Sequence, residues 1–209
     1  MFENKIRLWS VIILCLCGIG LSIGLVVWIF NHKNSRGYGG YNSGTSKYIS
    51  WANTVSVDPN TLYPVTDVID GDTIKVLIEG HIITVRLLGI NTPETVDPYK
   101  PVECFGPEAS NEVKKILTGK SVFLTLNANY ERVDKYGRLL AYVKLVQKPD
   151  GVSTTTSDLF VNEFLIKEGY AHEYTFNEKN PYQYQGLFKA DELEAKKAGK
   201  GLWGKCPII

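Results

Sequence analysis

The chain has 209 residues, of which 44% are hydrophobic and 22% are charged, and its 23 Lys and Arg against 22 Asp and Glu give a net charge of +1. This composition is typical of a folded protein and excludes a wholly disordered or collagen-like chain, and the small net charge excludes a protein that holds nucleic acid by bulk positive charge. Four cysteines without a CxxC pair and only three histidines argue against a disulfide scaffold and a structural zinc site.

The charge is unevenly distributed along the chain. Residues 1–60 carry five basic and two acidic side chains, whereas the remaining 149 residues carry 18 basic and 20 acidic ones. The basic excess therefore lies in the N-terminal part, and the part expected to fold has a net charge of −2.

Residues 9–31 are predicted to be a transmembrane anchor that follows a short flank, residues 1–8. The stretch from Trp9 to Phe30 has 22 residues without a charge, and about 20 such residues cross the hydrocarbon core of a bilayer. A cleaved signal peptide is the alternative, and the domain is then secreted. An A-x-A-like cleavage site is expected in that case, and none follows Phe30. Lys and Arg flank both ends equally, so charge leaves the orientation of the anchor open.

Residues 32–60 are predicted to be a flexible linker, because residues 33–50 are rich in Gly, Ser, Asn and Tyr without an apolar period. The domain is expected to occupy residues 61–206.

The order of elements in that domain predicts an α+β, mainly β fold. Short strand-like runs alternate or are continuously apolar, and they occupy residues 63–69, 73–79, 81–89, 121–127 and 138–146. Helix signals with terminal glycines occupy residues 107–117, 162–168 and 184–198. Five short antiparallel strands close best as a small barrel, since closure removes exposed edges. Residues 148–158 form a polar loop to which we assign no role.

Three polar clusters interrupt this pattern where a strand or turn does not need them. Their residues are Asp70-Gly71-Asp72-Thr73, Arg86 with Asn91-Thr92-Pro93-Glu94, and residues 131–138. Asp72, Asn91 and the Thr92 carbonyl offer oxygen ligands for a hard cation, and Arg86 and Arg138 offer bidentate forks for a phosphodiester. Glu94 is a carboxylate that could orient or deprotonate a water. Together these groups indicate phosphoryl-transfer chemistry.

The motifs in these clusters resemble those of the staphylococcal nuclease (thermonuclease) family. They are IDGDTIKV, VRLLGINTPET, GPEAS, DKYGRLLAYV and the tail that runs through Gly169-Tyr170-Ala171 and Gly201-Leu202-Trp203. The resemblance covers about residues 61–205 in order. It implies a five-stranded OB-fold barrel with three helices, and a calcium-dependent nuclease that cleaves single-stranded DNA and RNA and leaves 3′-phosphate ends.

The resemblance also implies a role for each matching position. Arg86 and Arg138 match the arginines that bind the scissile phosphate, and Glu94 matches the glutamate that acts as general base. The metal set would be Asp72 with Asp70 beside it, the Thr92 carbonyl, and Asn91 at the place of a second aspartate. The nucleotide would be contacted by Lys135, Tyr136 and, less closely matched, Tyr174 and Phe176.

Three departures from the family pattern carry expectations of their own. Asn91 removes one negative charge from the metal set, so we expect weaker calcium binding rather than none. Phe176 keeps an aromatic face but lacks a hydroxyl. The net charge of −2 predicts weaker and less salt-dependent substrate binding than a strongly basic relative would show.

Cys104 and Cys206 lie outside the predicted anchor, just before the first and just after the last predicted helix. A disulfide between them would tie the C-terminus to the barrel and would place the domain in an oxidising compartment. Two unrelated free thiols are the alternative.

We therefore interpret the chain as a single-pass, membrane-anchored, calcium-dependent nuclease, monomeric and without an implied protein partner, with its domain outside the cytoplasm. Two other interpretations stay open. The first is a catalytically weak or inactive nucleic-acid-binding module on the same barrel, and the second is a tethered protein-interaction domain with a vestigial site. The anchor orientation and the physiological substrate stay undetermined by the sequence.

Overall fold

The computed structural model describes residues 51–128, 130–146 and 158–207, all of which belong to the unit Ile49–Ile209. The predicted anchor, residues 9–31, most of the predicted linker and most of the polar loop at 148–158 lie outside the described residues. Among the residues that are described, no helix combines the length and hydropathy needed to cross a bilayer.

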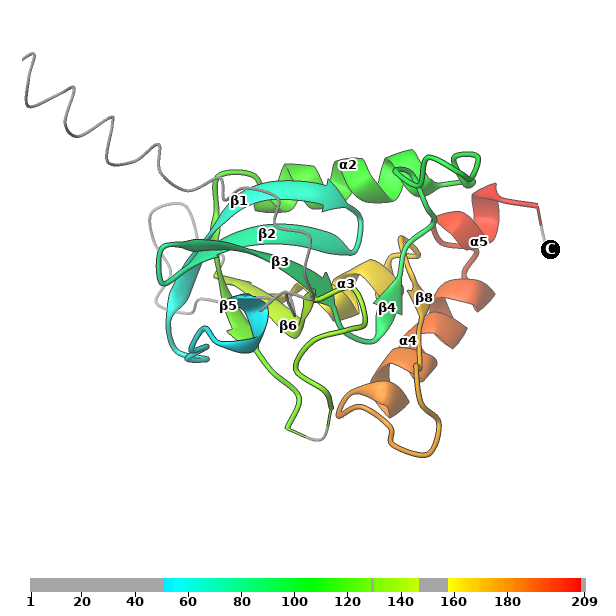
Figure 1. The fold of residues 1–209 in the computed structure, drawn as a ribbon. Helices are drawn as coiled ribbons and strands as arrows, with labels where there is room; N and C mark the ends of the chain where they lie inside the picture. Colours follow the sequence, from blue (N-terminus) through cyan, green and yellow to red (C-terminus); the bar gives the residue numbers. More distant parts are fainter. Residues whose placement is uncertain (1–50, 129, 147–157, 208–209) are drawn as a thin grey trace, which may run out of the picture. The chain divides into compact units, whose positions relative to one another are not determined.

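Five strands form a closed barrel (Figure 1). They are β1 (Leu62–Asp70), β2 (Thr73–Ile78), β3 (His81–Leu87), β5 (Ser121–Thr125) and β6 (Leu139–Val146). Neighbours pair in the order β3-β2-β1-β5-β6, and β3 pairs with β6 to close the sheet. The predicted five-stranded barrel is confirmed and is consistent with an OB-fold.

The expectation that all of these strands run antiparallel is wrong at one seam, because β3 and β6 are parallel there. Parallel neighbours need a long crossover connection, and here α2 and β5 lie between the two strands in the chain. The seam pairs Arg86 with Leu140 and Val85 with Leu139. It therefore places Arg86 close to the start of β6, which Arg138 immediately precedes.

Apolar side chains from alternate positions of the strands fill the barrel. In β2 the fully buried side chains are Ile74, Val76 and Ile78, which share one face because side chains alternate along a strand. The outward position Lys75 is partly exposed. This burial is the main stabilising contribution of the barrel.

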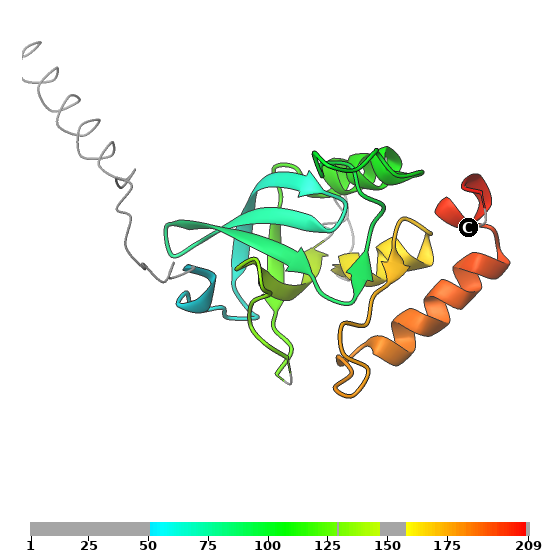
Figure 2. The same ribbon diagram turned by 45° about the vertical axis from the view of Figure 1, so that its right-hand side comes forward.

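Three predicted helices are present, within two residues of the expected bounds. They are α2 (Gly106–Leu117), α3 (Val161–Lys167) and α4 (Gln185–Lys197). Helix α2 packs on β1, and α4 packs on α3 (Figure 2). Asn162 of α3 is fully buried and links the helix to the barrel, since its amide donates to Leu88 O and accepts from Val143 N, both at 2.9 Å.

Several short elements have no counterpart in the sequence prediction. They are η1 (Trp51–Asn53), β4 (Ile90–Asn91), β7 (Asp158–Phe160), β8 (His172–Glu173) and α5 (Leu202–Lys205). Strand β4 pairs with β8 (Figure 1), and β8 is held to α4 because Glu192 accepts a hydrogen bond from Glu173 N at 3.1 Å. Elements of two to four residues are too short to show a hydrophobic period.

The described chain begins at Trp51, within the stretch expected to be linker, and Ala52 and Val55 are buried in the core. Arg132 donates to Ala52 O at 2.7 Å and also to Val55 O. These bonds hold the start of the domain against the connection between β5 and β6.

Candidate active site

The turn between β1 and β2 carries Asp72, whose buried carboxylate lies next to the start of the loop that follows β4. Asp72 Oδ1 accepts from Thr73 Oγ1 at 2.9 Å, and Asp72 Oδ2 accepts from Thr92 N at 3.0 Å. A side chain at Gly71 would lie 2.7 Å from the Thr92 methyl group. Glycine is therefore required for the turn to lie against Thr92.

Arg86 joins this turn to β4. Its Nη2 lies 2.9 Å from Asp72 Oδ2 and 2.9 Å from Asn91 Oδ1, and its Nη1 donates to Leu87 O and Ile90 O. Burial lowers the pKa of Arg86, the Asp72 carboxylate opposes this shift, and the Arg138 charge adds to it. The arginine stays protonated in such a site, so two cations face the same region.

Arg138 is held by a local turn. Its Nε and Nη2 both lie 2.6 Å from Asp134 Oδ2, while Asp134 Oδ1 accepts from the backbone N–H groups of Tyr136 and Arg138. Gly137 has a φ of 77°, which closes the turn at little cost. No role was predicted for Asp134, although an Asp at the first position of DKYGR is typical of an Asx turn.

Asp70 and Glu94 complete an acidic group beside Asp72. Burial raises the pKa of Asp70, hydrogen bonds from Thr95 Oγ1 and Gly71 N lower it, and the nearby charges of Asp72 and Glu94 raise it further. Thr95 was not foreseen as a partner, because its bond spans 25 residues and leaves no local sequence signal.

Glu94 begins the connection from β4 to α2. Its Oε1 accepts from the backbone N–H groups of Thr95, Val96 and Asp97 at 2.9, 2.8 and 3.1 Å. No hydrogen bond reaches its Oε2 from the residues that the structure describes. One carboxylate oxygen is thus fixed by the loop, and the other is left for a water or a substrate.

The predicted nucleotide contacts lie at the surface. Lys135 Nζ and the Arg138 guanidinium lie 4.9 and 5.1 Å from the Tyr136 ring centroid, and that ring is 70% exposed. Tyr174 is 48% exposed and adds to the charge environment of Arg86. Phe176 is 75% exposed.

Oxygen atoms that could hold a hard cation come from Asp72, Asn91 and Thr92, with Asp70 behind them. Thr92 Oγ1 is buried and lacks a hydrogen-bond partner among the described residues, and the set consists of the hard donors that calcium prefers. Over the same residues, no three His, Cys, Asp or Glu side chains are grouped to hold a metal. The proposed calcium ligands do not form such a group, because they include the Asn91 amide and a Thr92 oxygen.

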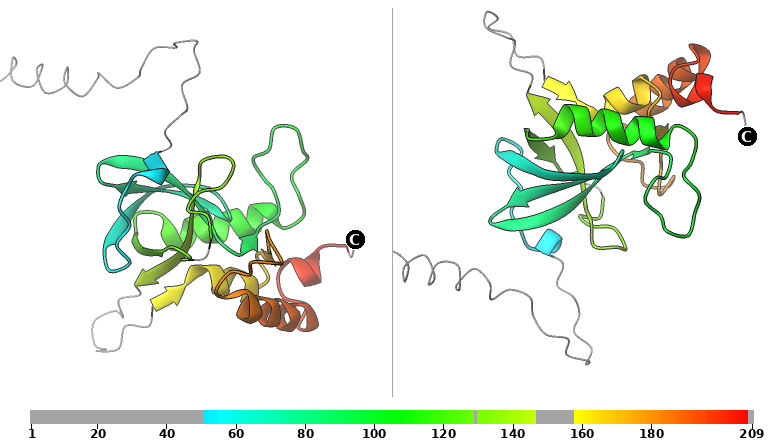
Figure 3. Two further views of the ribbon diagram at one scale, coloured as in Figure 1. Left: turned by 60° about the horizontal axis from the view of Figure 1, so that its bottom comes forward. Right: turned by 90° about the horizontal axis from the view of Figure 1, so that it is seen from above.

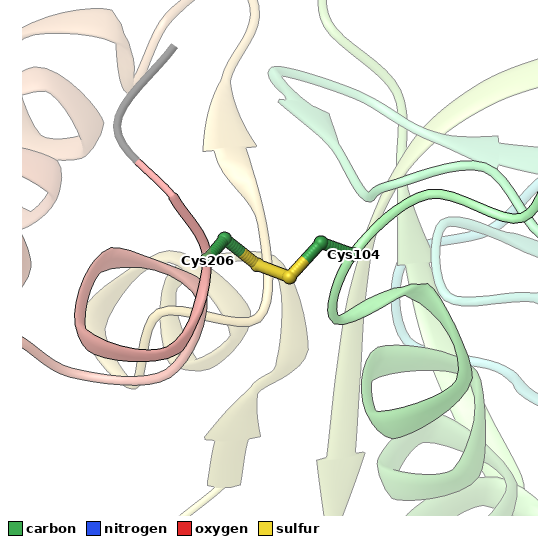
Figure 4. Close-up of a disulfide and its surroundings, with 2 residues drawn as sticks. All are labelled: Cys104 and Cys206. Carbon is green, nitrogen blue, oxygen red and sulfur yellow. A yellow bond between two sulfur atoms is a disulfide. The ribbon is translucent and has the colours of Figure 1, made fainter.

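Cys104 and Cys206 form a disulfide with an S–S distance of 2.09 Å (Figure 4). The bond joins the end of the loop after Glu94 to the residue that follows α5. It therefore connects the C-terminal helices to the candidate site.

Comparison with known proteins shows the family of the chain. The family model described as staphylococcal nuclease homologue matches residues 84–205. The chain is 42% identical to SPbeta prophage-derived endonuclease YokF of Bacillus subtilis (strain 168) over 66% of this chain and 42% of that protein. It is 39% identical to the thermonuclease of Staphylococcus hyicus over 68% of this chain and 75% of the relative.

A third relative, the thermonuclease of Staphylococcus intermedius, is 37% identical over 88% of this chain and 93% of its own length. The chain thus spans less than half of YokF but most of both thermonucleases. The matched range contains the positions of Arg86, Glu94 and Arg138 and begins after Asp70 and Asp72. The chain belongs to the staphylococcal nuclease family.

Proposed function

We propose that this chain is a calcium-dependent nuclease that hydrolyses single-stranded DNA and RNA and leaves 3′-phosphate ends. The observation that carries the proposal is the position of Arg86, which bonds Asp72 and Asn91 through one nitrogen and lies near Arg138. Cations beside a group of hard oxygen donors are what a phosphodiester in its transition state requires. Family membership and relatives named as endonuclease and thermonuclease support the same activity.

Both arginines keep donors available for a phosphate. Within the described residues, Arg86 uses Nη1 and Nη2 internally, which leaves Nε. Arg138 uses Nε and one side of Nη2 on Asp134, which leaves Nη1. Asp134 therefore orients Arg138 while the outer part of its guanidinium faces the substrate.

Glu94 is the proposed general base. Its loop-bound Oε1 fixes the carboxylate, and Oε2 takes a proton from a water whose oxygen bonds to phosphorus. The P–O5′ bond breaks, and the 5′ oxygen leaves with a proton from solvent. Arg86 and Arg138 stabilise the extra negative charge on the phosphoryl oxygens, which is largest in the transition state.

Calcium would be held by Asp72, Asn91 and Thr92, with Asp70 supporting the site. A bound cation of this kind supplies charge stabilisation and orients the water. Asp72 Oδ2 and Asn91 Oδ1 lie close enough together to share one Arg86 nitrogen, so one ion that displaced this nitrogen could contact both oxygens. Thr92 Oγ1, buried and without a partner among the described residues, is a further oxygen beside the Thr92 carbonyl.

The exposed rings of Tyr136, Tyr174 and Phe176 are proposed to contact unpaired bases, and Lys135 is proposed to contact a phosphate. Base stacking on aromatic rings favours single strands.

We also propose that residues 9–31 anchor a monomeric domain outside the cytoplasm. The Cys104–Cys206 disulfide is compatible with an oxidising compartment.

The test is cleavage of end-labelled single-stranded DNA and RNA by the full-length chain in detergent, with calcium or with excess chelator. Glu94→Gln should lower kcat by at least about 10²-fold. Glu194→Gln, an exposed carboxylate on α4, is the matched control and should keep the rate. Products should carry 3′-phosphates, detected by their mobility shift after phosphatase treatment.

Two outcomes would contradict the proposal. Full activity of Glu94→Gln would remove the assigned base. Binding of oligonucleotides without cleavage, with calcium present, would favour the non-catalytic binding module.

A further inference from the structure

The loop between β4 and α2 is closed at its base by two hydrogen bonds between Glu94 and Glu103. Glu94 N donates to Glu103 Oε2 at 2.9 Å, and Glu103 N donates to Glu94 O at 2.9 Å. The residues between them project from the barrel (Figure 3). Val96, Tyr99 and Val102 are 55%, 94% and 59% exposed, so packing of these side chains on the barrel does little to fix the loop.

The orientation of the Glu94 carboxylate depends on this loop. Oε1 accepts from three consecutive N–H groups that belong to the loop itself. If the backbone of residues 95–97 shifts, the carboxylate shifts with it. Thr95 Oγ1 ties the start of this segment to Asp70 at 2.7 Å, and the two bonds with Glu103 hold the ends of the loop together. Both restraints fix the proposed base relative to the barrel.

Glu103 is also held in place through its neighbour Cys104, at the end of the loop that leads into α2. Cys104 is bonded to Cys206 (Figure 4). The C-terminal side of the bond is anchored because Cys206 N donates to Leu202 O and Leu202 N donates to Gly169 O, at the end of α3. A side chain at Gly106 would lie 3.1 Å from Glu94 O, so the start of α2 lies against the same backbone.

We propose that Glu103 is a positioning residue for Glu94, and that the Cys104–Cys206 disulfide keeps Glu103 in place and so makes turnover sensitive to reduction. This inference rests on the proposed function of Glu94 as general base. A misplacement of about 1 Å can cost about 10²-fold in rate. Loss of the Glu103 acceptor or of the disulfide therefore lowers kcat, while phosphate binding by Arg86 and Arg138 is retained.

The first test compares Glu103→Ala with Glu103→Gln in the full-length chain. Glu103→Ala should lower kcat about tenfold or more and leave KM within about twofold. Glu103→Gln should restore most of kcat, because its amide oxygen still accepts from Glu94 N. Glu108→Ala removes an exposed carboxylate in the first turn of α2 and is the matched control. A purely structural role of Glu103 would move the melting temperature without this split between kcat and KM.

The second test measures hydrogen exchange by mass spectrometry and kcat before and after reduction of the folded protein, and again in Cys104→Ser/Cys206→Ser. Exchange should rise in the peptide that covers residues 94–103 and stay unchanged in β2, with a parallel fall in kcat. Circular dichroism at the assay temperature identifies any sample that has unfolded. Glu103→Ala keeps the disulfide and tests the positioning role independently.

Unchanged kcat and unchanged exchange in Glu103→Ala, with Glu94→Gln inactive, would overturn this inference and leave the proposed function intact. Unchanged kcat in reduced, folded protein would overturn the part played by the disulfide. Full activity of Glu94→Gln would instead overturn the proposed function and this inference together.

Discussion

The guanidinium of Arg86 and the carboxylate of Asp72 form an ion pair at 2.9 Å in which the two side chains are only 11% and 10% exposed. The same Arg86 nitrogen also holds the Asn91 amide, and the other terminal nitrogen binds two carbonyls of the chain that leads into β4. One side chain thus fixes the β1–β2 turn relative to β4, and the site depends on the planar fork of arginine.

Arg86→Lys should therefore be a severe change. Lysine carries one nitrogen with three donors and cannot reach the four acceptors that Arg86 contacts. We expect kcat/KM for single-stranded DNA to fall by about 10²-fold or more. Lys75→Gln, on the neighbouring strand and ion-paired with the exposed Asp67, should keep the wild-type value within about twofold. Wild-type kinetics of Arg86→Lys would mean that Arg86 does not contact the phosphate.

Asn91→Asp should tighten calcium binding. The change adds one negative charge to the proposed oxygen set, and affinity rises with the charge of the ligands. We expect the calcium concentration at half-saturation to be about tenfold lower, both in calorimetry and in the calcium dependence of cleavage. Asn111→Asp adds the same charge on the exposed side of α2 and controls for long-range electrostatics. Equal calcium affinity of Asn91→Asp and wild type would exclude Asn91 from the metal set.

Asn162→Ala should destabilise the barrel without touching the site. The substitution leaves Leu88 O and Val143 N without the partners that Asn162 supplies in the core. A buried group left unsatisfied costs about 1–3 kcal/mol, so we expect a loss of about 3 kcal/mol in the free energy of unfolding, measured by urea denaturation. Asn111→Ala, on the exposed side of α2, should be neutral or slightly stabilising.

Glu192 makes the attachment of β8 to α4 dependent on pH. Burial by itself raises the pKa of Glu192, but the contact with His172 at 3.8 Å and hydrogen bonds from Lys196 and Glu173 N outweigh it and hold the pKa at about 2. A carboxylate with a lowered pKa stabilises the fold above its unfolded pKa, and this contribution is lost as pH falls through the folded pKa.

Glu192→Gln should therefore lower the free energy of unfolding by about 1–2 kcal/mol at pH 7, since solvent screens part of the interaction. The difference from wild type should shrink as pH is lowered from about 4.5 towards 2. Urea denaturation at a series of pH values checks this, with Glu194→Gln, an exposed neighbour in α4, as control. A difference that stays constant down to pH 2 would contradict the assigned cause.

The barrel was predictable because each of its strands is long enough to show an apolar pattern and is bounded by turn residues. The parallel pairing of Arg86 with Leu140 was not, since these residues lie far apart in the chain and α2 and β5 lie between them. Short pairings such as Asn91 with His172 likewise depend on tertiary packing.

The candidate site residues came from the chemistry of the polar clusters and from motif resemblance, and the structure brings Asp70, Asp72, Arg86, Asn91 and Arg138 together. Their supporting partners were largely missed. Glu103 and Thr95 bond groups 9 and 25 residues away, and neither spacing has a sequence signature. Asp134 is the exception, because its bonds stay within the DKYGR turn.

The Cys104–Cys206 bond, which spans 102 residues, makes the second half of the domain a covalent ring. A single break in the backbone anywhere between the two cysteines opens that ring but leaves one molecule. Glu94 and Arg86 precede the ring, whereas Arg138 lies within it. A nicked chain would therefore keep both sides of the active site in one covalent unit, and its refolding would be first order rather than dependent on the encounter of two fragments.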